Sequence, residues 1–254
     1  MRRSIWKPIL LLLPALLLVA CAVDRQARKR QGEASRNLGE AFMHEGNYTA
    51  ALRELLRAEE LIPDDPYLQN DLGLTYMARE RHDQAIAHFR KAVRLDSDYA
   101  PARNNLGTAY LAKGEWDAAI AVFSELTDDL LYATPHFPLT NLGFAYYNKG
   151  NYEMAERYYR QALELQPRYI IALRGLGRTY LAAGKISQAV ETLEKAVELA
   201  PRFPALYLDM ARAYAAAADL EGALDAYRMT MSLAPDTDLA RTAKQETDNL
   251  PRSR

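Results

Sequence analysis

The feature that most constrains the fold is a repeat of 34 residues that runs through most of the chain. A Leu-Gly pair, or its Met-Ala equivalent, recurs six times, at Leu38-Gly39, Leu72-Gly73, Leu106-Gly107, Leu142-Gly143, Leu176-Gly177 and Met210-Ala211. Successive pairs are separated by 34, 34, 36, 34 and 34 residues. A fixed period of this length is the mark of an array of small, stacked supersecondary units.

Further positions of the repeat predict two helices in each unit. An aromatic residue lies four positions after each Leu or Met, and therefore on the same helical face, at Phe42, Tyr76, Tyr110, Tyr146, Tyr180 and Tyr214. An Ala and a large apolar residue, again four apart, then follow in a second segment of every unit. Between the segments, four units place a glycine where a turn with positive φ is expected, at Gly46, Gly114, Gly150 and Gly184. Proline closes four units, because it cannot continue a helix, at Pro63, Pro167, Pro201 and Pro235.

This pattern resembles the tetratricopeptide repeat (TPR) over residues 32–237. The resemblance implies an all-α fold, a TPR solenoid that winds as a right-handed superhelix of six helix-turn-helix repeats and ends in a C-terminal capping helix. The six repeats are assigned to residues 32–65, 66–99, 100–133, 136–169, 170–203 and 204–237. Residues 238–254 are assigned to the capping helix and tail, with the helix from Asp238 to about Asn249.

The third repeat departs from the pattern. Its closing positions are Leu126 and Leu131 instead of Ala and Pro, and two extra residues lengthen the junction at 126–135. We expect the array to bend or loosen there.

The amino terminus, residues 1–20, has the form of an export signal. Basic residues precede an apolar run from Ile9 to Ala20, which is too short to span about 30 Å of hydrocarbon and is interrupted by Pro14. Leu18-Val19-Ala20-Cys21, with the only cysteine of the chain, resembles the lipobox of bacterial lipoproteins. That resemblance implies acylation of Cys21 and a membrane anchor. The alternative is an ordinary signal peptide with an incidental cysteine nearby.

Ala22, which is not an aspartate, implies by the lipoprotein sorting rule an outer-membrane location on the periplasmic side of a double-membraned bacterium. Residues 21–31 are interpreted as the lipidated cysteine and a short tether. Because this tether is basic, it can either contact anionic headgroups or remain a solvated linker.

Composition argues against several classes of function. Lys and Arg number 32 against 33 Asp and Glu, which gives no basic surface for a nucleic acid. One cysteine excludes an intramolecular disulfide and a thiolate-rich metal site. The four histidines, at positions 44, 82, 88 and 136, show no metal-ligand spacing, and the glycines form no phosphate-binding loop. We therefore expect no metal, no cofactor, no small-molecule substrate, no catalytic residue and no enzymatic activity.

The concave surface of such an array is lined by the first helix of each repeat. Groove-facing positions precede Leu by two, follow Gly by one, or follow the aromatic by one, with Phe137 one turn earlier. The candidate partner-binding residues are Asn70, Leu74, Met77, Asn104, Thr108, Leu111, Phe137, Thr140, Phe144, Tyr147, Arg174, Arg178 and Arg212. This groove is apolar and aromatic in its middle and basic toward its C-terminal end, which suits an extended peptide or a helix. The alternative for some of these residues is ordinary packing between adjacent repeats.

The combination of lipobox, six repeats and lengthened third junction resembles the type IV pilus biogenesis and stability lipoproteins, the PilW/PilF-type pilotins. The resemblance implies binding of a protein partner, a secretin or another pilus assembly protein, and help in its localisation and assembly at the outer membrane. Two other interpretations remain open. One is a generic periplasmic TPR lipoprotein that acts as an adaptor for cell-envelope assembly complexes. The other is an enzyme subunit or a hydrolase, for which the sequence offers no acid/base constellation.

Overall fold

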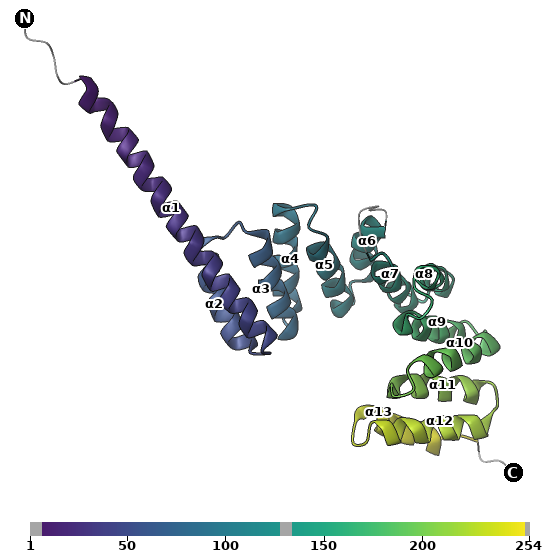
Figure 1. Cartoon of the computed structure of the whole chain (residues 1–254). Helices are drawn as coiled ribbons and strands as arrows, with labels where there is room; N and C mark the ends of the chain where they lie inside the picture. Colours follow the sequence, from purple (N-terminus) through teal and green to yellow (C-terminus); the bar gives the residue numbers. More distant parts are fainter. Residues whose placement is uncertain (1–6, 128–133, 252–254) are drawn as a thin grey trace, which may run out of the picture. The chain divides into compact units, whose positions relative to one another are not determined.

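The structure is a computed structural model that describes residues 7–127 and 134–251, with side chains described from residue 24 onward. The described residues form thirteen α-helices and no strand (Figure 1). Their bounds are α1 Lys7–His44, α2 Tyr48–Leu61, α3 Pro66–Ala78, α4 His82–Leu95, α5 Ala100–Lys113, α6 Trp116–Thr127, α7 His136–Asn148, α8 Tyr152–Leu165, α9 Ile170–Ala182, α10 Ile186–Leu199, α11 Pro204–Ala216, α12 Leu220–Leu233 and α13 Asp238–Asp248. The predicted all-α fold of helix-turn-helix repeats with a C-terminal capping helix is confirmed.

The chain divides into two compact units, residues 1–113 and residues 114–254, and each is described by itself. The first unit holds α1 to α5 and the second holds α6 to α13. The division falls in the turn between α5 and α6, inside the third repeat, and therefore before the lengthened junction that the sequence singled out. Residues 128–133 of that junction lie outside the described residues.

The signature leucine of a repeat packs against the second helix of the preceding repeat. Leu72 of α3 is fully buried in one cluster with Leu55 and Ala58 of α2. Leu176 of α9 is buried with Tyr159 and Ala162 of α8 in the same way. Leu38 occupies this position in the first repeat, and its side chain is 47% exposed. Leu38 is exposed because, among the described residues, no second helix of an earlier repeat covers it.

The small residue beside the leucine allows close approach of two helices, as the sequence predicted. A Cβ atom on Gly73 would lie 2.4 Å from the ring of Phe89, and one on Gly143 would lie 2.9 Å from the ring of Tyr159. Both rings come from the second helix of the same repeat, so these glycines set how tightly the pair packs.

The turn between the two helices of a repeat requires one residue with positive φ. Gly46, Gly114, Gly150 and Gly184 have φ between 74° and 78°, as predicted. Glu80 and Ala218 take this conformation in the second and sixth repeats, at φ 59° and 61°. A side chain at such a position costs about 1–2 kcal/mol relative to glycine, so these two turns carry local strain.

Helix α1 is much longer than the first helix of any other repeat, with 38 residues. It includes residues 21–31, interpreted above as a tether, because no proline or glycine interrupts the chain between Pro14 and Gly32. Its amino-terminal half extends past the end of α2 (Figure 1). None of the helices in the described part of the chain combines the length and the apolar character needed to cross a membrane.

At the other end of the chain, α13 packs against α12 and buries Ala243 together with Ala223 and Tyr227. Thr237 begins the helix, and its hydroxyl accepts a hydrogen bond from the backbone N–H of Ala240. The predicted capping helix thus covers the apolar face of the sixth repeat.

Candidate functional site

In the second unit, the first helix α9 lies between the first helices α7 and α11 and contacts both. Helix α7 carries two large exposed rings, Phe137 at 40% and Phe144 at 37% exposed. Phe144 packs edge-on against Trp116 of α6, with ring centroids 6.1 Å apart. Phe137 packs edge-on against Tyr169, with centroids 5.6 Å apart. These four residues, Trp116, Phe137, Phe144 and Tyr169, are referred to below as the aromatic patch.

Thr140, on the same helix, does not belong to this surface. Its side chain is buried, and its hydroxyl donates a hydrogen bond of 2.7 Å to the backbone carbonyl of His136. The sequence-based prediction that Thr140 lines a groove is therefore wrong, because its hydroxyl is satisfied inside its own helix.

The three predicted groove arginines converge on one buried carboxylate. Asp209 of α11 is 2% exposed, and one of its oxygens accepts a hydrogen bond of 2.5 Å from Nε of Arg174. Its other oxygen lies 4.0 Å from Arg178 and 3.6 Å from Arg212. We call Arg174, Arg178, Arg212 and Asp209 the arginine cluster. A buried carboxylate requires such partners, since an unpaired buried charge is costly.

Glu246 of α13 neutralises a second charge of the cluster. It accepts hydrogen bonds from Arg212, the shortest of 2.6 Å, and from the hydroxyl of Tyr227 at 3.0 Å. The Arg212 hydrogen bond lowers the pKa of Glu246, while burial and the bond to Glu246 raise the pKa of Tyr227 to about 12. The basic stripe expected from the sequence is therefore largely compensated: two carboxylates face its three guanidinium groups.

A cavity of about 230 Å³ opens beside the cluster. Tyr147 lines one side, with the guanidinium of Arg178 over its ring at 5.0 Å. Leu181, Ala182, Asp209 and Arg212 complete the lining. The cavity offers aromatic, cationic and apolar contacts together, which is the composition of a peptide-recognition site.

In the first unit, the predicted groove residues of α3 and α5 divide into two groups. Asn70 is buried and accepts a 2.9 Å hydrogen bond from Nδ2 of Asn105, so it links α3 to α5 and does not face a ligand. The prediction that Asn70 lines the groove is therefore wrong, and the alternative interpretation, packing between adjacent repeats, applies to it. Half-buried or exposed side chains at the remaining positions form the accessible surface: Leu74, Met77, Asn104, Thr108 and Leu111.

Asn104 has the least complete hydrogen bonding of these residues. Within the described part of the chain, its Oδ1 atom is buried and accepts no hydrogen bond. The hydroxyl of Thr108 donates a hydrogen bond of 3.0 Å to the backbone carbonyl of Asn104.

Arg36 and Asp71 were not singled out by the sequence. Asp71 Oδ2 lies 3.9 Å from Nε of Arg36, and the Arg36 guanidinium also reaches Asp65 at 3.5 Å. Burial raises the pKa of Asp71 to about 7, although Arg36 partly offsets this effect. Asp71, Asn105 and Asp209 occupy the same position of the repeat, directly before the signature Leu or Met. This shared position is the sequence feature that could have identified them as contact residues.

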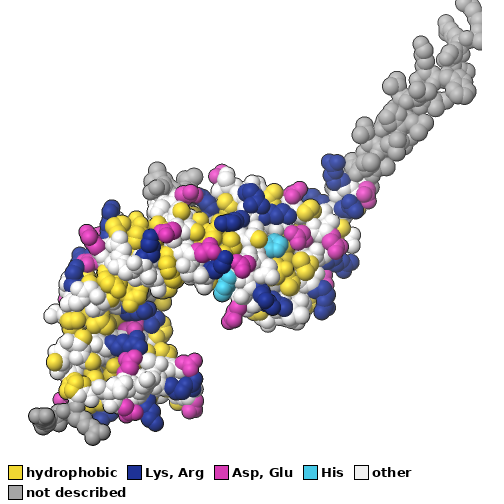
Figure 2. All heavy atoms as spheres, turned by 180° about the vertical axis from the view of Figure 1, so that it is seen from behind, with side chains coloured by type: hydrophobic (Ala, Val, Ile, Leu, Met, Phe, Trp, Pro, Cys, Tyr) yellow, Lys and Arg dark blue, Asp and Glu magenta, His cyan; other side chains and the backbone are white. Residues whose placement is uncertain are grey.

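Among residues 7–127 and 134–251 there is no group of three or more His, Cys, Asp and Glu side chains that could hold a metal ion. His88 stacks on Tyr76 and faces Gln69 at 2.8 Å, and burial lowers its pKa. On the face shown in Figure 2, Lys and Arg side chains are interspersed with Asp and Glu side chains and form no single basic area.

Family comparisons match almost the whole repeat region. Residues 102–128, 137–202 and 181–246 match models described as "Tetratricopeptide repeat", and residues 39–79 and 73–114 match one described as "TPR repeat". Comparison with curated proteins gave no match.

Solved structures with a similar fold include two pilus proteins. PilW, described as a widely conserved type IV pilus biogenesis factor, is 21% identical, with a TM-score of 0.77 over 84% of this chain and 98% of PilW. PilF of Pseudomonas aeruginosa is 19% identical, with a TM-score of 0.71 over 87% of this chain and 99% of PilF. YrrB, described as a TPR protein with an unusual peptide-binding site, is 22% identical, with a TM-score of 0.54 over 75% of this chain and 97% of YrrB. At these identities the likeness establishes the fold alone.

Proposed function

Because the chain belongs to the tetratricopeptide-repeat proteins, we propose that it is an outer-membrane lipoprotein that binds secretin subunits and promotes their localisation and assembly for type IV pilus biogenesis. The observation that carries the binding role is the aromatic patch, whose two exposed phenylalanines lie on the first helix α7. Exposed aromatic side chains that pack on one another form rigid anchors for a protein partner. The fold likeness to PilW and PilF supports the choice of partner.

The aromatic patch and the cavity of the arginine cluster share Helix α7, which carries Phe144 and Tyr147 within one turn of each other. A peptide or helix that lies along α7 can place an apolar side chain against Phe144 and a polar group near Arg178, whose guanidinium lies over the ring of Tyr147. The site thereby combines apolar anchoring with a charged contact that fixes orientation.

The proposed anchor at Cys21 determines where the protein binds its partner. An acylated cysteine and a partner-binding surface on one chain confine the encounter to the membrane surface and raise the effective concentration of the partner there. Secretin subunits would then assemble beside the bilayer that must accept them. The role assigned to the protein is therefore localisation and assembly, with no chemical step.

The test is deletion of the gene, with secretin multimers measured by their heat-resistant migration in gels. We expect multimers to fall and monomers to accumulate, and the wild-type gene supplied in trans to restore them. Unchanged multimers would contradict the proposal. Affinity purification of the intact chain after cross-linking in cells separates the alternative, since recovery of cell-wall assembly factors without a secretin would indicate a generic envelope adaptor.

A further inference from the structure

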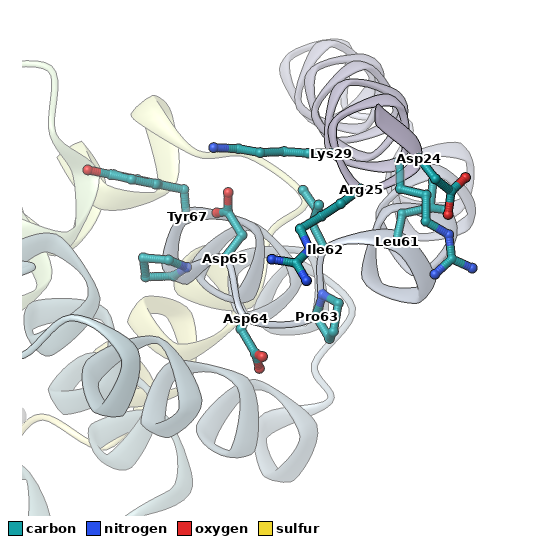
Figure 3. A pocket seen from close by; sticks show the side chains of 11 residues that line it. Asp24, Arg25, Lys29, Leu61, Ile62, Pro63, Asp64, Asp65 and Tyr67 are labelled. Atoms are coloured by element: carbon teal, nitrogen blue, oxygen red, sulfur yellow. The ribbon is translucent and has the colours of Figure 1, made fainter. Parts of the chain in front are cut away.

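The first unit contains a cavity of about 570 Å³ between α1 and the loop that joins α2 to α3 (Figure 3). This volume lies within the range of about 300–1,000 Å³ that is typical of small-molecule sites. Its lining comes from one face of α1 and from the end of α2 through the start of α3: Asp24, Arg25, Arg28, Lys29, Leu61, Ile62, Pro63, Asp64, Asp65, Pro66 and Tyr67. None of these residues belongs to the surfaces described above except Asp65, which faces Arg36.

The cavity joins charges of both signs to an apolar wall. Figure 3 shows Arg25 and Lys29 reaching from α1 toward the loop, and the Asp65 carboxylate pointing to the side on which Lys29 lies. Leu61 and Ile62 supply apolar surface on the side of α1, and Tyr67 lies beyond Asp65 with its hydroxyl directed away from the two cations. The lining holds three cations and three carboxylates, so a ligand that carries both signs of charge can contact both kinds. Lys29 also lies 3.7 Å from Glu33, and a phosphate can displace this exposed ion pair because such pairs contribute little.

The position of the cavity along α1 ties it to the proposed anchor. Residues 24 to 29 lie three to eight positions after Cys21 in the same helix, which is roughly 5–12 Å along the axis. The headgroup layer of a bilayer is about 5–8 Å deep on each side of the hydrocarbon. If Cys21 is acylated, the cavity therefore opens in or directly beside the headgroup layer.

We propose that this cavity binds the headgroup of a phospholipid that carries both a phosphate and a primary ammonium, namely phosphatidylethanolamine. Arg25 and Lys29 bind the phosphate, as guanidinium and ammonium groups do at phosphate sites. Asp65 accepts a hydrogen bond from the ammonium of the lipid, whereas the Asp64 carboxylate points away from that side of the cavity in Figure 3. Leu61 and Ile62 provide the apolar wall that the glycerol carbons of the lipid contact.

Asp65 can take this role without losing its structural one. Its Oδ1 atom accepts the α3 capping hydrogen bond from the backbone N–H of Leu68 at 2.8 Å and lies 3.5 Å from Arg36. The second carboxylate oxygen remains for a ligand. Bound lipid would then hold the extended half of α1 against the α2–α3 loop, and so fix the orientation of the first unit at the membrane. This inference rests on the proposed acylation of Cys21.

The test uses the intact protein purified from bacterial membranes and equilibrated with vesicles of equal parts phosphatidylethanolamine, phosphatidylcholine and phosphatidylglycerol. Native mass spectrometry then reports which lipid the protein retains non-covalently. We expect one phosphatidylethanolamine per chain, and about a fivefold lower occupancy in Arg25→Ala, the size of effect expected for one cation near a membrane surface. Arg30→Ala is the matched control, since Arg30 is an exposed cation of the same helix that does not line the cavity.

Three results would overturn the proposal: retention without headgroup preference, preference for phosphatidylglycerol, or equal losses in Arg25→Ala and Arg30→Ala. Equal melting temperatures of the two variants ensure that a loss reflects the site and not the fold. Denatured mass spectrometry of the same samples reports acyl groups on Cys21 separately. Lipid retained by a chain without acyl groups would refute the anchor at Cys21 and support lipid binding in the cavity. Acylated Cys21 without retained lipid would support the anchor and refute lipid binding in the cavity.

Discussion

Arg174 donates a hydrogen bond of 2.5 Å to Asp209, the residue that lies 35 positions later in the chain. The same separation joins Asn70 to Asn105 at 2.9 Å and Arg36 to Asp71 at 3.9 Å. Each pair links the residue two before one signature Leu to the residue directly before the next signature Leu or Met. Polar contacts of this kind, which we call rungs, thus connect α1 to α3, α3 to α5 and α9 to α11, whereas α7 and α9 have Thr140 and Gly175 at the corresponding positions.

Asp209→Asn should lower the free energy of unfolding by about 1–3 kcal/mol, because the buried carboxylate that accepts from Arg174 and lies near Arg178 and Arg212 loses its charge. Urea unfolding followed by circular dichroism measures this loss. Asp225→Asn is the matched control: its partner Arg228 is on the surface, and exposed ion pairs contribute little. Similar losses in the two variants would contradict the assignment of Asp209 as the centre of the cluster.

Asp71 should make stability fall as pH rises toward neutrality. Burial raises its pKa from 3.8 to about 7, so between these values the folded protein holds a proton that the unfolded chain releases. Its contribution is complete below pH 3.8 and is lost as pH rises to about 7, with a total on the order of 1–3 kcal/mol. Asp71→Asn should flatten urea midpoints measured from pH 4.5 to 8. Exposed Asp98→Asn should keep the wild-type slope.

Phe144→Asp should weaken partner binding about tenfold, since aromatic anchors at interfaces contribute most of the affinity. The measurement is secretin capture by the purified variant, with helicity checked by circular dichroism. Leu165→Asp introduces the same charge at a more exposed apolar residue outside the aromatic patch, and it should bind as the wild type does. Tyr147→Asp should also weaken binding, although it removes the Arg178 contact as well. Normal capture by Phe144→Asp would move the site elsewhere.

Cys21→Ser should release the protein from the membrane fraction, because it removes the only thiol that can be acylated. Ala22→Asp keeps that thiol, and by the sorting rule of lipoproteins it should shift the protein from the outer to the inner membrane. Density-gradient fractionation distinguishes these outcomes. Unchanged fractionation of Cys21→Ser would refute the anchor.

Ala218→Gly should stabilise the sixth repeat by about 1 kcal/mol, because it relieves a positive φ of 61° at a residue with a Cβ atom. Neighbouring Ala217 has φ −79°, where glycine offers no relief and adds entropy to the unfolded chain. Ala217→Gly should therefore be destabilising. Thermal melting of both variants checks the sign, and a lower melting temperature in Ala218→Gly would contradict the assignment of strain to this turn.

Local periodicity was sufficient to predict the helices of the fold. The Leu-Gly-aromatic spacing, the turn glycines and the closing prolines each act within one repeat, so they can be recognised without a partner segment. The exposure of Leu38 depends on whether another helix covers it, and the spacing of residues within one repeat does not contain that information. Residues 21–31 form part of a continuous helix because they contain no proline or glycine. The interpretation of this segment as a tether did not take that into account.

The candidate site was predicted only in part, because its side chains interact between repeats. Phe137 and Phe144 are exposed as expected, whereas Thr140 and Asn70 are buried. Helical periodicity places a residue on a face, but it cannot tell whether the adjacent helix covers that face. Comparing residues one repeat apart would have revealed Asp209 as the partner of Arg174.

The rungs also restrict how the repeats can be ordered. Moving the fourth repeat to a place directly before the sixth would bring Thr140 beside Asp209, whose carboxylate would lose the guanidinium of Arg174. Placing the first repeat before the fifth would set Arg36 beside Gly175, which has no side chain to receive it. The backbones are interchangeable, but the polar side chains are not. The repeats that share a rung are therefore matched to one another, and shuffled versions of this chain that separate them should fold less well than their common helical pattern suggests.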